Sequence, residues 1–336
     1  MMASCAPPHA PDATLVSALT VSVVVPTYDR PEWLVRCLES LLRMTRVPDE
    51  IIAVMRDTDL ATQQAFECFV AGHARADVRI RRAFVKEPGF LPPVEQGIAE
   101  ATGDIVVFLD DDSEASSDWL ERLLQPYSDP NVGGVGGRCV NADPQGRTIV
   151  YPPARYPARF YWFGRIVGNM YRDVVGDGPR DVDFFCGGNM SYRGAALKDV
   201  LLDRNLGRDV AFHYEVDLGL QLRERGWKLI YDPDTRVRHF SAPRKIAGLR
   251  TQSSDSVFWL SHNVLYIALK HSHGLRRLLT VTYSFAVGST NEWGFASAAV
   301  DIIRRRRLKA LRELMVAFRG KMLAIRETAG RPGGQR

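Results

Sequence analysis

The sequence lacks the cysteine pattern of a disulfide-stabilised or zinc-binding protein. Its 336 residues include five cysteines, at positions 5, 37, 68, 139 and 186, an odd number without CxxC spacing. This pattern argues against a disulfide framework and a cysteine zinc site, and indicates a reducing compartment. The composition, with 46% hydrophobic and 25% charged residues, is that of an ordinary globular protein. A chain of this length can bury a large core without covalent cross-links.

Long apolar segments are also missing. The longest candidate, residues 278–290, has about 13 residues before Asn291 and Glu292 interrupt it, fewer than the roughly 18 of a spanning helix. A buried or interfacial helix is the better interpretation. Residues 1–19 lack the basic start and the long apolar run of a signal peptide, so we expect a disordered leader there.

Phosphate-binding glycine motifs are absent as well. The chain contains no GK[ST] of a P-loop, and GGVGG at residues 133–137 lacks the GxGxxG spacing. We interpret this glycine segment as tight packing or a turn. The aromatic and Arg-rich residues 151–163 could stack on sugars or bases, but a hydrophobic loop lying on the core is the favoured interpretation.

Alternating patterns between about residues 20 and 130 predict an α/β domain. Continuous apolar or β-branched runs predict strands at residues 21–25, 50–55, 78–84 and 105–109. Apolar residues spaced by three and four predict helices at residues 31–44, 62–69, 94–102 and 117–127, the last with a serine cap. Strands that alternate with helices imply a parallel, doubly wound sheet.

Three adjacent aspartates follow the last of these strands, in the sequence IVVFLDDDSE of residues 105–114. Adjacent carboxylates repel one another and are costly to desolvate, so we expect a metal ion or a basic partner beside them. Open α/β sheets bind ligands in the crevice at the carboxyl ends of their strands. Asp110, Asp111 and Asp112 therefore indicate a binding site.

Paired glycines mark a second candidate segment, DVDFFCGGNMSYRG at residues 181–194. Gly187, Gly188 and Asn189 follow a strand-like DFFC. Glycines let a ligand approach the backbone closely, and the asparagine amide offers a donor and an acceptor. A simple turn explains the same residues.

Two acids mark a third segment, residues 213–240. Glu215 and Asp217 lie at the start of a helix expected over residues 216–225, which Gly226 ends. Acids at a helix N-terminus are favourable caps, and an acid in a cleft is also a candidate general base. His239 follows a strand expected at residues 227–231, and either a structural role or a ligand role fits it.

Four segments in this order resemble family 2 of the glycosyltransferases, which are inverting enzymes with the GT-A fold. They are VSVVVPTYDRPEWLVRCLESLL, GDIVVFLDDDSEASSDWLERLL, VDFFCGGNMSYR and YEVDLGLQLRERGWKLIYDPDTRVRHF. The resemblance implies a GT-A domain with a mostly parallel sheet over residues 20–240 and a helical C-terminal extension over residues 241–336. It also implies a hexosyl- or deoxyhexosyltransferase of bacterial exopolysaccharide, lipopolysaccharide or rhamnosyl type.

The resemblance assigns donor-binding roles to several residues. Thr27 and Tyr28 would line the nucleotide pocket. Asp57 would bind the nucleobase, with Asp59 as the less favoured candidate. Asp110 and Asp111 would hold the ribose and a metal-bound water.

The same resemblance implies a divalent metal, Mg²⁺ or Mn²⁺. Asp112 would ligate it directly and His239 would complete the site. Such ions take one or two carboxylates and fill their other positions with phosphate oxygens and water.

The acceptor side and the base follow from the resemblance too. Gly187, Gly188 and Asn189 would line the acceptor side. The acidic pair usual in the family is Glu-Asp, whereas this chain has Tyr214-Glu215. Glu215 would therefore be the catalytic base, and Asp217 stays open as the alternative.

Some positions depart from the family pattern. The usual Ala-Arg-Asn before the acidic strand is Pro93-Val94-Glu95, and Asp57 lies in MRDTD rather than DDGS. The QxxRW of processive synthases is not matched by QLRERGW. We therefore expect transfer of a single sugar from a nucleotide-diphosphate sugar to a glycan or lipid-linked acceptor.

The C-terminal segment is strongly basic. Residues 304–326 contain nine Lys or Arg and one acid, Glu313, so this segment is +8 while the whole chain is +5. Its apolar residues recur at three and four: Leu308, Leu311, Leu314, Met315, Phe318, Met322 and Leu323. This predicts an amphipathic cationic helix for an anionic membrane surface, although a solvated helix packed on the body fits as well. We expect a cytoplasmic protein peripheral to the inner face of the plasma membrane, with no nucleic-acid partner.

Two other functions compete. A nucleotidyltransferase shares the sheet and the metal-binding acids, but VVVPTYDRPEW lacks its glycine-rich basic phosphate loop. A nucleic-acid or lipid-surface binding protein would use the basic tail, but it would not need three acids at a strand end.

Overall fold

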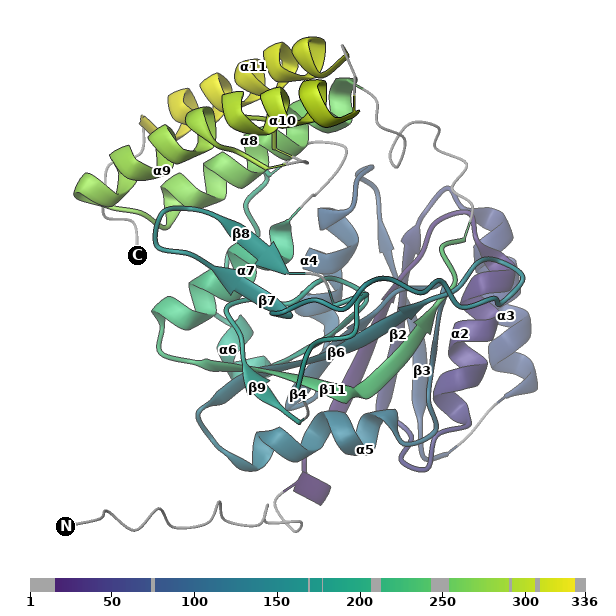
Figure 1. Ribbon diagram of the computed structural model, residues 1–336. Helices are drawn as coiled ribbons and strands as arrows, with labels where there is room; N and C mark the ends of the chain where they lie inside the picture. Colours follow the sequence, from purple (N-terminus) through teal and green to yellow (C-terminus); the bar gives the residue numbers. More distant parts are fainter. Residues whose placement is uncertain are drawn as a thin grey trace, which may run out of the picture.

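The structure is a computed structural model that describes residues 16–73, 76–168, 170–176, 178–206, 213–242, 254–289, 292–305 and 309–329. A central sheet has helices on both faces, and a group of helices from the C-terminal part lies together at one end (Figure 1). Among the described residues, no helix combines the length and the apolar character that crossing a bilayer requires.

The described central sheet has nine strands. They are β1 (Val21–Pro26), β2 (Glu50–Arg56), β3 (Arg79–Val85), β4 (Ile105–Leu109), β5 (Ser113–Ala115), β6 (Val132–Asn141), β9 (Arg180–Asp181), β10 (Asn189–Arg193) and β11 (Lys228–His239). Their order is β3-β2-β1-β4-β10-β6-β11-β5, with β9 also paired to β11.

The first four strands are parallel, as predicted, and the rest make the sheet mixed. β10 runs antiparallel between β4 and β6, while β11 runs parallel to β6 and antiparallel to β5 and β9. In β1, Val21, Val23 and Val25 enter one core and Val24 the other. Burial on both faces explains the continuous β-branched runs of these strands.

Helices cover the two faces of the sheet. α2 (Pro31–Leu42), α3 (Leu60–Gly72) and α5 (Trp119–Leu124) pack on one face. α4 (Leu91–Glu100), α6 (Gly194–Leu197) and α7 (Tyr214–Glu224) pack on the other. The helix expected at residues 117–127 is α5 followed by a 3₁₀ turn, η1 (Gln125–Ser128), and the predicted serine cap is wrong because Asp118 is the N-cap residue.

The two glycine segments have different roles. GGVGG lies inside β6, so packing rather than a turn explains it: a Cβ at Gly136 would lie 2.4 Å from the Phe185 ring. The expected DFFC strand is wrong. Residues 183–186 form no strand, and the buried Phe185 fills the space that the β6 glycines leave.

The C-terminal extension consists of α8 (Ser254–Lys270), α9 (Gly274–Ala286), α10 (Phe295–Arg305) and α11 (Lys309–Ala329). α11 lies along α8 and approaches it closely at Gly320, where a Cβ would be 2.3 Å from the Phe258 carbonyl oxygen. A hairpin of β7 (Ala158–Phe160) and β8 (Ile166–Gly168) joins the extension to the sheet domain, since Phe163 contacts Tyr283 with ring centroids 4.7 Å apart. The loop at residues 151–163 is thus partly packed, as favoured.

The structure differs in some details from the expectations for the two ends of the chain. Residues 1–15 and Leu308 lie outside the described residues, but Val16 and Leu19 pack on the core beside α2, and Arg46 donates hydrogen bonds to both of their carbonyls. In α11, Leu311, Met315 and Met322 are exposed. Lys321, expected among the surface cations, is fully buried.

Candidate active site

The carboxyl ends of β2, β1 and β4 bring the predicted donor residues to one edge of the sheet. The three strands are adjacent and parallel, so the residues that follow them emerge side by side. Thr27 and Tyr28 follow β1, Asp57 follows β2, and Asp110 begins the triplet after β4.

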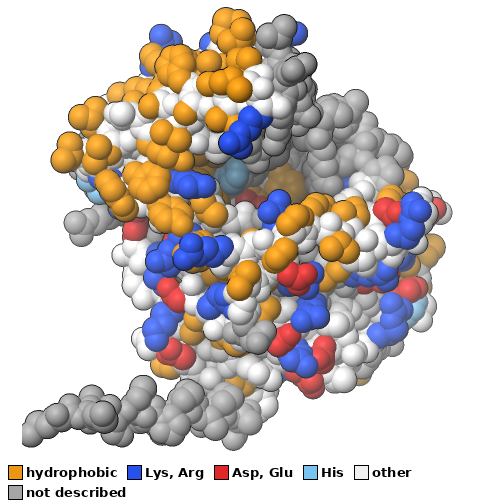
Figure 2. Space-filling view, in the orientation of Figure 1, with side chains coloured by type: hydrophobic (Ala, Val, Ile, Leu, Met, Phe, Trp, Pro, Cys, Tyr) orange, Lys and Arg blue, Asp and Glu red, His pale blue; other side chains and the backbone are white. Residues whose placement is uncertain are grey.

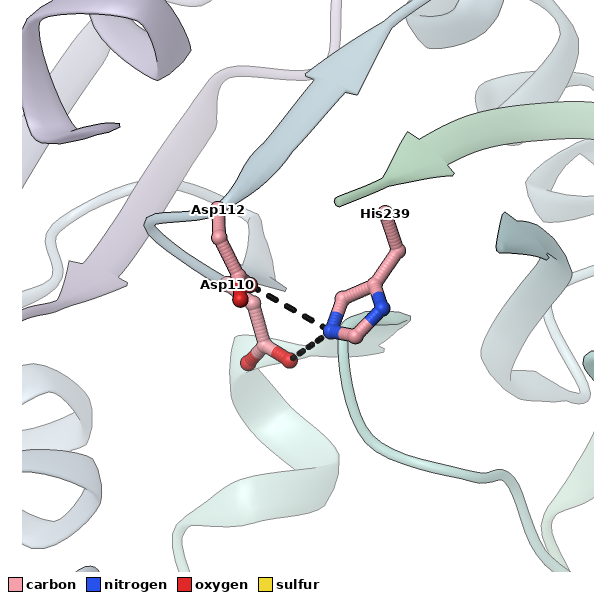
Figure 3. Close-up of side chains that lie close together, drawn as sticks. All are labelled: Asp110, Asp112 and His239. Carbon is pink, nitrogen blue, oxygen red and sulfur yellow. Dashed lines mark ion pairs between the residues drawn. The ribbon is translucent and has the colours of Figure 1, made fainter. Parts of the chain in front are cut away.

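Asp110, Asp112 and His239 form one cluster at this edge. One ligand atom from each lies within 4.8 Å of the others. His239 ends β11 and pairs with Ser113 of β5, which places the imidazole beside the triplet. Its Nε2 is 3.3 Å from Asp112 Oδ1 and 3.6 Å from Asp110 Oδ2 (Figure 3).

The hydrogen bonds of His239 suit a metal ligand. Nδ1 lies 2.9 Å from Asn141 Oδ1, and the Asn141 amide nitrogen donates to Tyr151, so Nδ1 carries the proton. Nε2 is buried and has no hydrogen-bond partner among the described residues. In the neutral imidazole its lone pair then faces two carboxylates, an arrangement that a cation between them would stabilise. The donor set of two carboxylates and one imidazole therefore fits a divalent metal.

Arg30, which the sequence analysis did not select, is the basic partner of the triplet. Its Nη1 lies 2.7 Å from Asp111 Oδ1 and 3.3 Å from Asp112 Oδ2, and its Nη2 donates to the Ala242 carbonyl at 2.9 Å. Thr27 donates to the second oxygen of Asp111 at 2.8 Å. Protein groups therefore bind both oxygens of Asp111. Arg30 ends the segment VVVPTYDR, and this position was the available indication for it in the sequence.

The pKa of Asp111 reflects both its burial and the neighbouring acid. Burial raises the pKa of Asp111 to about 7, although the Arg30 guanidinium opposes the shift and the Asp112 charge adds to it. The positive charge of Arg30 therefore neutralises the three aspartates only partly.

The two candidates for binding the nucleobase of the donor, Asp57 and Asp59, differ in environment. Asp59 is buried, caps α3 by accepting from the Thr62 N–H at 3.2 Å, and accepts from the Asp29 N–H at 2.5 Å. Asp57 is exposed beside Tyr28, whose ring lies 5.6 Å from the Arg56 guanidinium carbon. Asp57 is thus available to a ligand and Asp59 is a structural cap.

A glycine turn separates the metal-side acids from Glu215. A Cβ at Gly188 would lie 2.9 Å from Asp110 Oδ2, and a Cβ at Gly187 would lie 2.5 Å from Glu215 Oε1. Gly188 also has a φ of +93°, which favours glycine. The pair of glycines therefore lets two acids approach one backbone segment from either side.

Glu215 is a carboxyl group whose affinity for protons is increased. Burial raises its pKa to about 8, and the Asp110 charge adds to the shift, while the backbone N–H groups of Glu215 and Gly187 oppose it. A group with such a pKa can take up a proton near neutral pH and hold it.

Asn189 and Asp217 do not face this edge. The Asn189 amide accepts from Trp119 Nε1 at 3.0 Å and donates to the carbonyls of Arg138 and Thr235, so it joins elements inside the sheet domain. Asp217 is buried against α8, where Lys270 Nζ and His271 Nε2 each lie 2.8 Å from its oxygens. The contacts of both residues are structural.

Backbone strain is concentrated around the site. The described non-glycine residues with positive φ are Asp29, His213 and Ser241, at 54°, 66° and 47°. Asp29 follows the Thr27–Tyr28 loop, His213 precedes the helix of Glu215, and Ser241 follows His239. Such conformations cost on the order of 1–3 kcal/mol each and collect at functional sites.

Comparison with known proteins gives a family match. The family model described as "Glycosyl transferase family 2" matches residues 22–201. Glucosyl-dolichyl phosphate glucuronosyltransferase of Haloferax volcanii is 29% identical over 252 residues, which cover 71% of this chain and 74% of that protein. The O-antigen biosynthesis protein RfbC of Myxococcus xanthus is 26% identical over 259 residues, 72% of this chain but only 19% of that much longer protein.

A solved structure shares the fold. Mannosyltransferase PcManGT from Pyrobaculum calidifontis, in complex with GDP-Man and Mn²⁺, matches with a TM-score of 0.55 and 14% identity. The match covers 93% of this chain and 86% of that chain. At this identity the likeness shows the fold alone.

Proposed function

Because the chain belongs to family 2 of the glycosyltransferases, we propose that it is a metal-dependent, inverting enzyme that transfers a single hexose or deoxyhexose. The donor is a nucleotide-diphosphate sugar and the acceptor is a hydroxyl group. The observation that supports this most is that two acids approach the Gly187–Gly188 turn: Asp110, which belongs to the cluster with Asp112 and His239, and Glu215. The family match decides against the nucleotidyltransferase and the non-enzymatic binding protein.

The donor lies along the carboxyl edge of β2, β1 and β4. The exposed Asp57 and Tyr28 contact the nucleoside, and Asp110, Asp112 and His239 would hold a divalent ion. When bound, Mg²⁺ or Mn²⁺ neutralises the diphosphate and makes it a better leaving group. Arg30 keeps Asp111 and Asp112 oriented while the diphosphate is absent and when it departs. The Mn²⁺ in the PcManGT complex supports the choice of ion.

Glu215 acts as the general base. It takes the proton of the acceptor hydroxyl as that oxygen forms a bond to the anomeric carbon. The bond from the anomeric carbon to the diphosphate oxygen breaks, and the nucleotide diphosphate leaves with the electron pair. Attack from the face opposite the leaving group inverts the anomeric centre, through a transition state with oxocarbenium character as in glycoside hydrolysis.

The acceptor is a lipid-linked or cell-envelope glycan, and the enzyme is peripheral to the inner face of the plasma membrane. Two names support this class: the Haloferax relative acts on a dolichyl phosphate glycan, and RfbC is named for O-antigen biosynthesis. The basic α10–α11 segment supports the location.

Calorimetric titration with UDP, GDP and dTDP, each with and without Mn²⁺, tests the proposal. We expect one nucleotide to bind, and to bind only with the ion. Binding of none by a folded protein would refute the donor site. Equal binding with and without Mn²⁺ would refute the metal dependence while leaving the donor site in place.

A further inference from the structure

Helix α9 turns some of its large apolar residues outward. Its fully buried residues are Thr280 and Ser284, Val281 and Phe285 pack partly buried on the core, and Leu275 and Leu278 are 71% and 62% exposed. A helix on a water-soluble protein normally turns its leucines inward and its hydroxyl groups outward. The outward face of α9 is therefore suited to an apolar environment.

Helices α10 and α11 also turn large apolar residues outward, although Ile302, Leu314 and Val316 pack partly buried on the core cluster of the extension. In α10, Ala298 and Asp301 are buried, while Phe295 and Ile303 are 60% and 77% exposed. In α11 the small residues Ala310, Ala317 and Ala324 are buried, and Leu311 and Met315 are exposed. Small and polar residues between helices, with large apolar residues outside, is the packing pattern of helices in lipid.

The buried charged groups of the extension, Lys321 and Glu292, have polar partners, and Ser284 donates to Glu292. Lys321 Nζ donates to the carbonyls of Ser284 and Trp293 at 2.6 and 2.7 Å and lies 3.5 Å from Glu292 Oε1. These contacts join α11 to α9 and to the segment before α10. Turning the helices over would break these hydrogen bonds and expose the buried Lys321.

The outward apolar residues of the three helices are together called the outer face here: Leu275, Leu278, Phe295, Ile303, Leu311 and Met315. Phe318 joins the three helices, because its ring contacts Phe285 of α9 and Phe295 of α10. Figure 2 shows hydrophobic side chains gathered over α9, α10 and α11. Exposed apolar patches of this kind mark interaction sites.

The charge around the outer face is positive. Arg312, Arg319 and Arg326 are exposed at intervals of seven residues, next to the exposed apolar residues of α11. The acids of these helices are less exposed than these arginines: among the described side chains of α9–α11, Asp301 is buried and Glu313 and Glu327 are half-buried. An apolar surface beside exposed arginines is complementary to anionic lipid headgroups over acyl chains.

We propose that the outer face docks onto an anionic phospholipid bilayer, with α9, α10 and α11 lying in the plane of the interface. The proposal deepens the proposed function and rests on it, because a lipid-linked acceptor requires the enzyme at a bilayer. Trp162, 60% exposed, lies beside the face, since its carbonyl accepts from Arg276 of α9 at 2.5 Å. A second copy of the chain is a poorer occupant because a two-fold contact would bring arginine rows together.

Vesicle flotation of the full chain tests the proposal. The vesicles are phosphatidylcholine alone, or phosphatidylcholine with about 30% phosphatidylglycerol. One variant carries Leu275→Gln, Leu278→Gln and Ile303→Gln, and a second carries Arg312→Gln, Arg319→Gln and Arg326→Gln. The matched control carries Val150→Gln, Val175→Gln and Leu201→Gln, which replace equally exposed apolar residues outside the extension.

We expect the wild type and the control to float with anionic vesicles. The leucine–isoleucine variant should lose at least about tenfold in partitioning, and the arginine variant should lose its preference for anionic over neutral vesicles. Failure of the wild type to float, or unchanged flotation of the leucine–isoleucine variant, would overturn the proposal. A wild-type dimer in light scattering that this variant dissociates would assign the face to self-association instead.

Nucleotide calorimetry on the same samples separates this proposal from the proposed function. Loss of flotation with nucleotide binding kept is the expected result for the leucine–isoleucine variant. Flotation of a wild-type protein that binds no nucleotide would refute the donor site and leave the docking surface intact.

Discussion

Two buried acidic clusters, one at the α7–α8 contact and one at the carboxyl edge of the sheet, differ in how completely their charge is balanced. At the α7–α8 contact, Asp217 has Lys270 and His271 at 2.8 Å on its two oxygens, and Glu224 lies 2.7 Å from the other nitrogen of His271. At the carboxyl edge, His239 commits Nδ1 to Asn141 and leaves Nε2 without a hydrogen-bond partner among the described residues. The first cluster is balanced by protein groups, whereas the second is the one that a bound cation would balance.

Glu215 and Asp217 show the same contrast within one helix. They are two residues apart in α7, and residues at that spacing do not share a helix face. Only one of the two can therefore reach the edge that carries Asp110. The turn of the helix directs Glu215 to the Gly187 side and Asp217 to α8. The acid proposed as the general base and an acid that holds the fold can thus be neighbours in sequence.

The sharpest test of the contrast is Asp112→Asn. We expect loss of detectable Mn²⁺-dependent release of nucleotide diphosphate, because the cluster loses a charged ligand. Thermal stability should be unchanged or slightly higher, since one of several crowded like charges is removed. Turnover is measured with the donor whose nucleotide binds, and unfolding by calorimetry. Asp118→Asn, at an exposed pair with Arg122, is the control, and normal turnover by Asp112→Asn would remove the metal assignment.

The next effect is that of Glu215→Gln. We expect kcat to fall by about 10²–10⁴-fold, the loss of a general base, with nucleotide affinity near that of the wild type. The base must be ionised, so wild-type kcat/KM should rise with pH and level off above about pH 8, the pKa of Glu215. The variant should lack this rise. If Asp217→Asn shows the fall in kcat instead, Glu215 is not the base.

Asp217→Asn should act on stability. Removing one member of a buried ion pair costs about 3–5 kcal/mol, and we expect the lower end because Lys270 keeps Asp203 and His271 keeps Glu224. The folded variant should retain kcat within about tenfold. Urea denaturation measures the loss, and Asp181→Asn, which breaks an exposed pair with Arg223, should cost about 0–1 kcal/mol. Equal losses in both variants would contradict the contrast between the clusters.

The smallest effect concerns pH and His271. Burial lowers the pKa of His271, but the hydrogen bonds and charges of Asp217 and Glu224 outweigh it, and the pKa is raised above 6.5. The folded state then holds a proton that the unfolded state releases. The stabilisation is fully present below about pH 6.5 and is lost as pH rises through the folded-state pKa.

The difference in unfolding free energy between the wild type and His271→Gln isolates this contribution. It cancels the decline that Glu215, also with a raised pKa, contributes between about pH 4.5 and 8 in both proteins. We expect the difference to shrink as pH rises above about 6.5. A difference independent of pH would mean that His271 is neutral in the folded state.

Elements whose causes are local could be predicted from the sequence. The apolar runs of β1, β2 and β4 predicted strands, because continuous burial requires continuous hydrophobicity, and the acids directly after β4 predicted a site at the carboxyl edge. Gly187, Gly188 and Glu215 could also be selected as candidates from the sequence, because each lies within a few residues of an expected strand or helix.

The balance of charge at each cluster depends instead on contacts between residues that are distant in the sequence. The contact of Arg30 with Ala242 spans 212 residues and the pair of His239 with Asn141 spans 98, so no local pattern encodes them. The orientation of α9, α10 and α11 was undecided for a similar reason. Amphipathic spacing shows that a helix has two different faces, but packing against neighbours decides which face is turned outward.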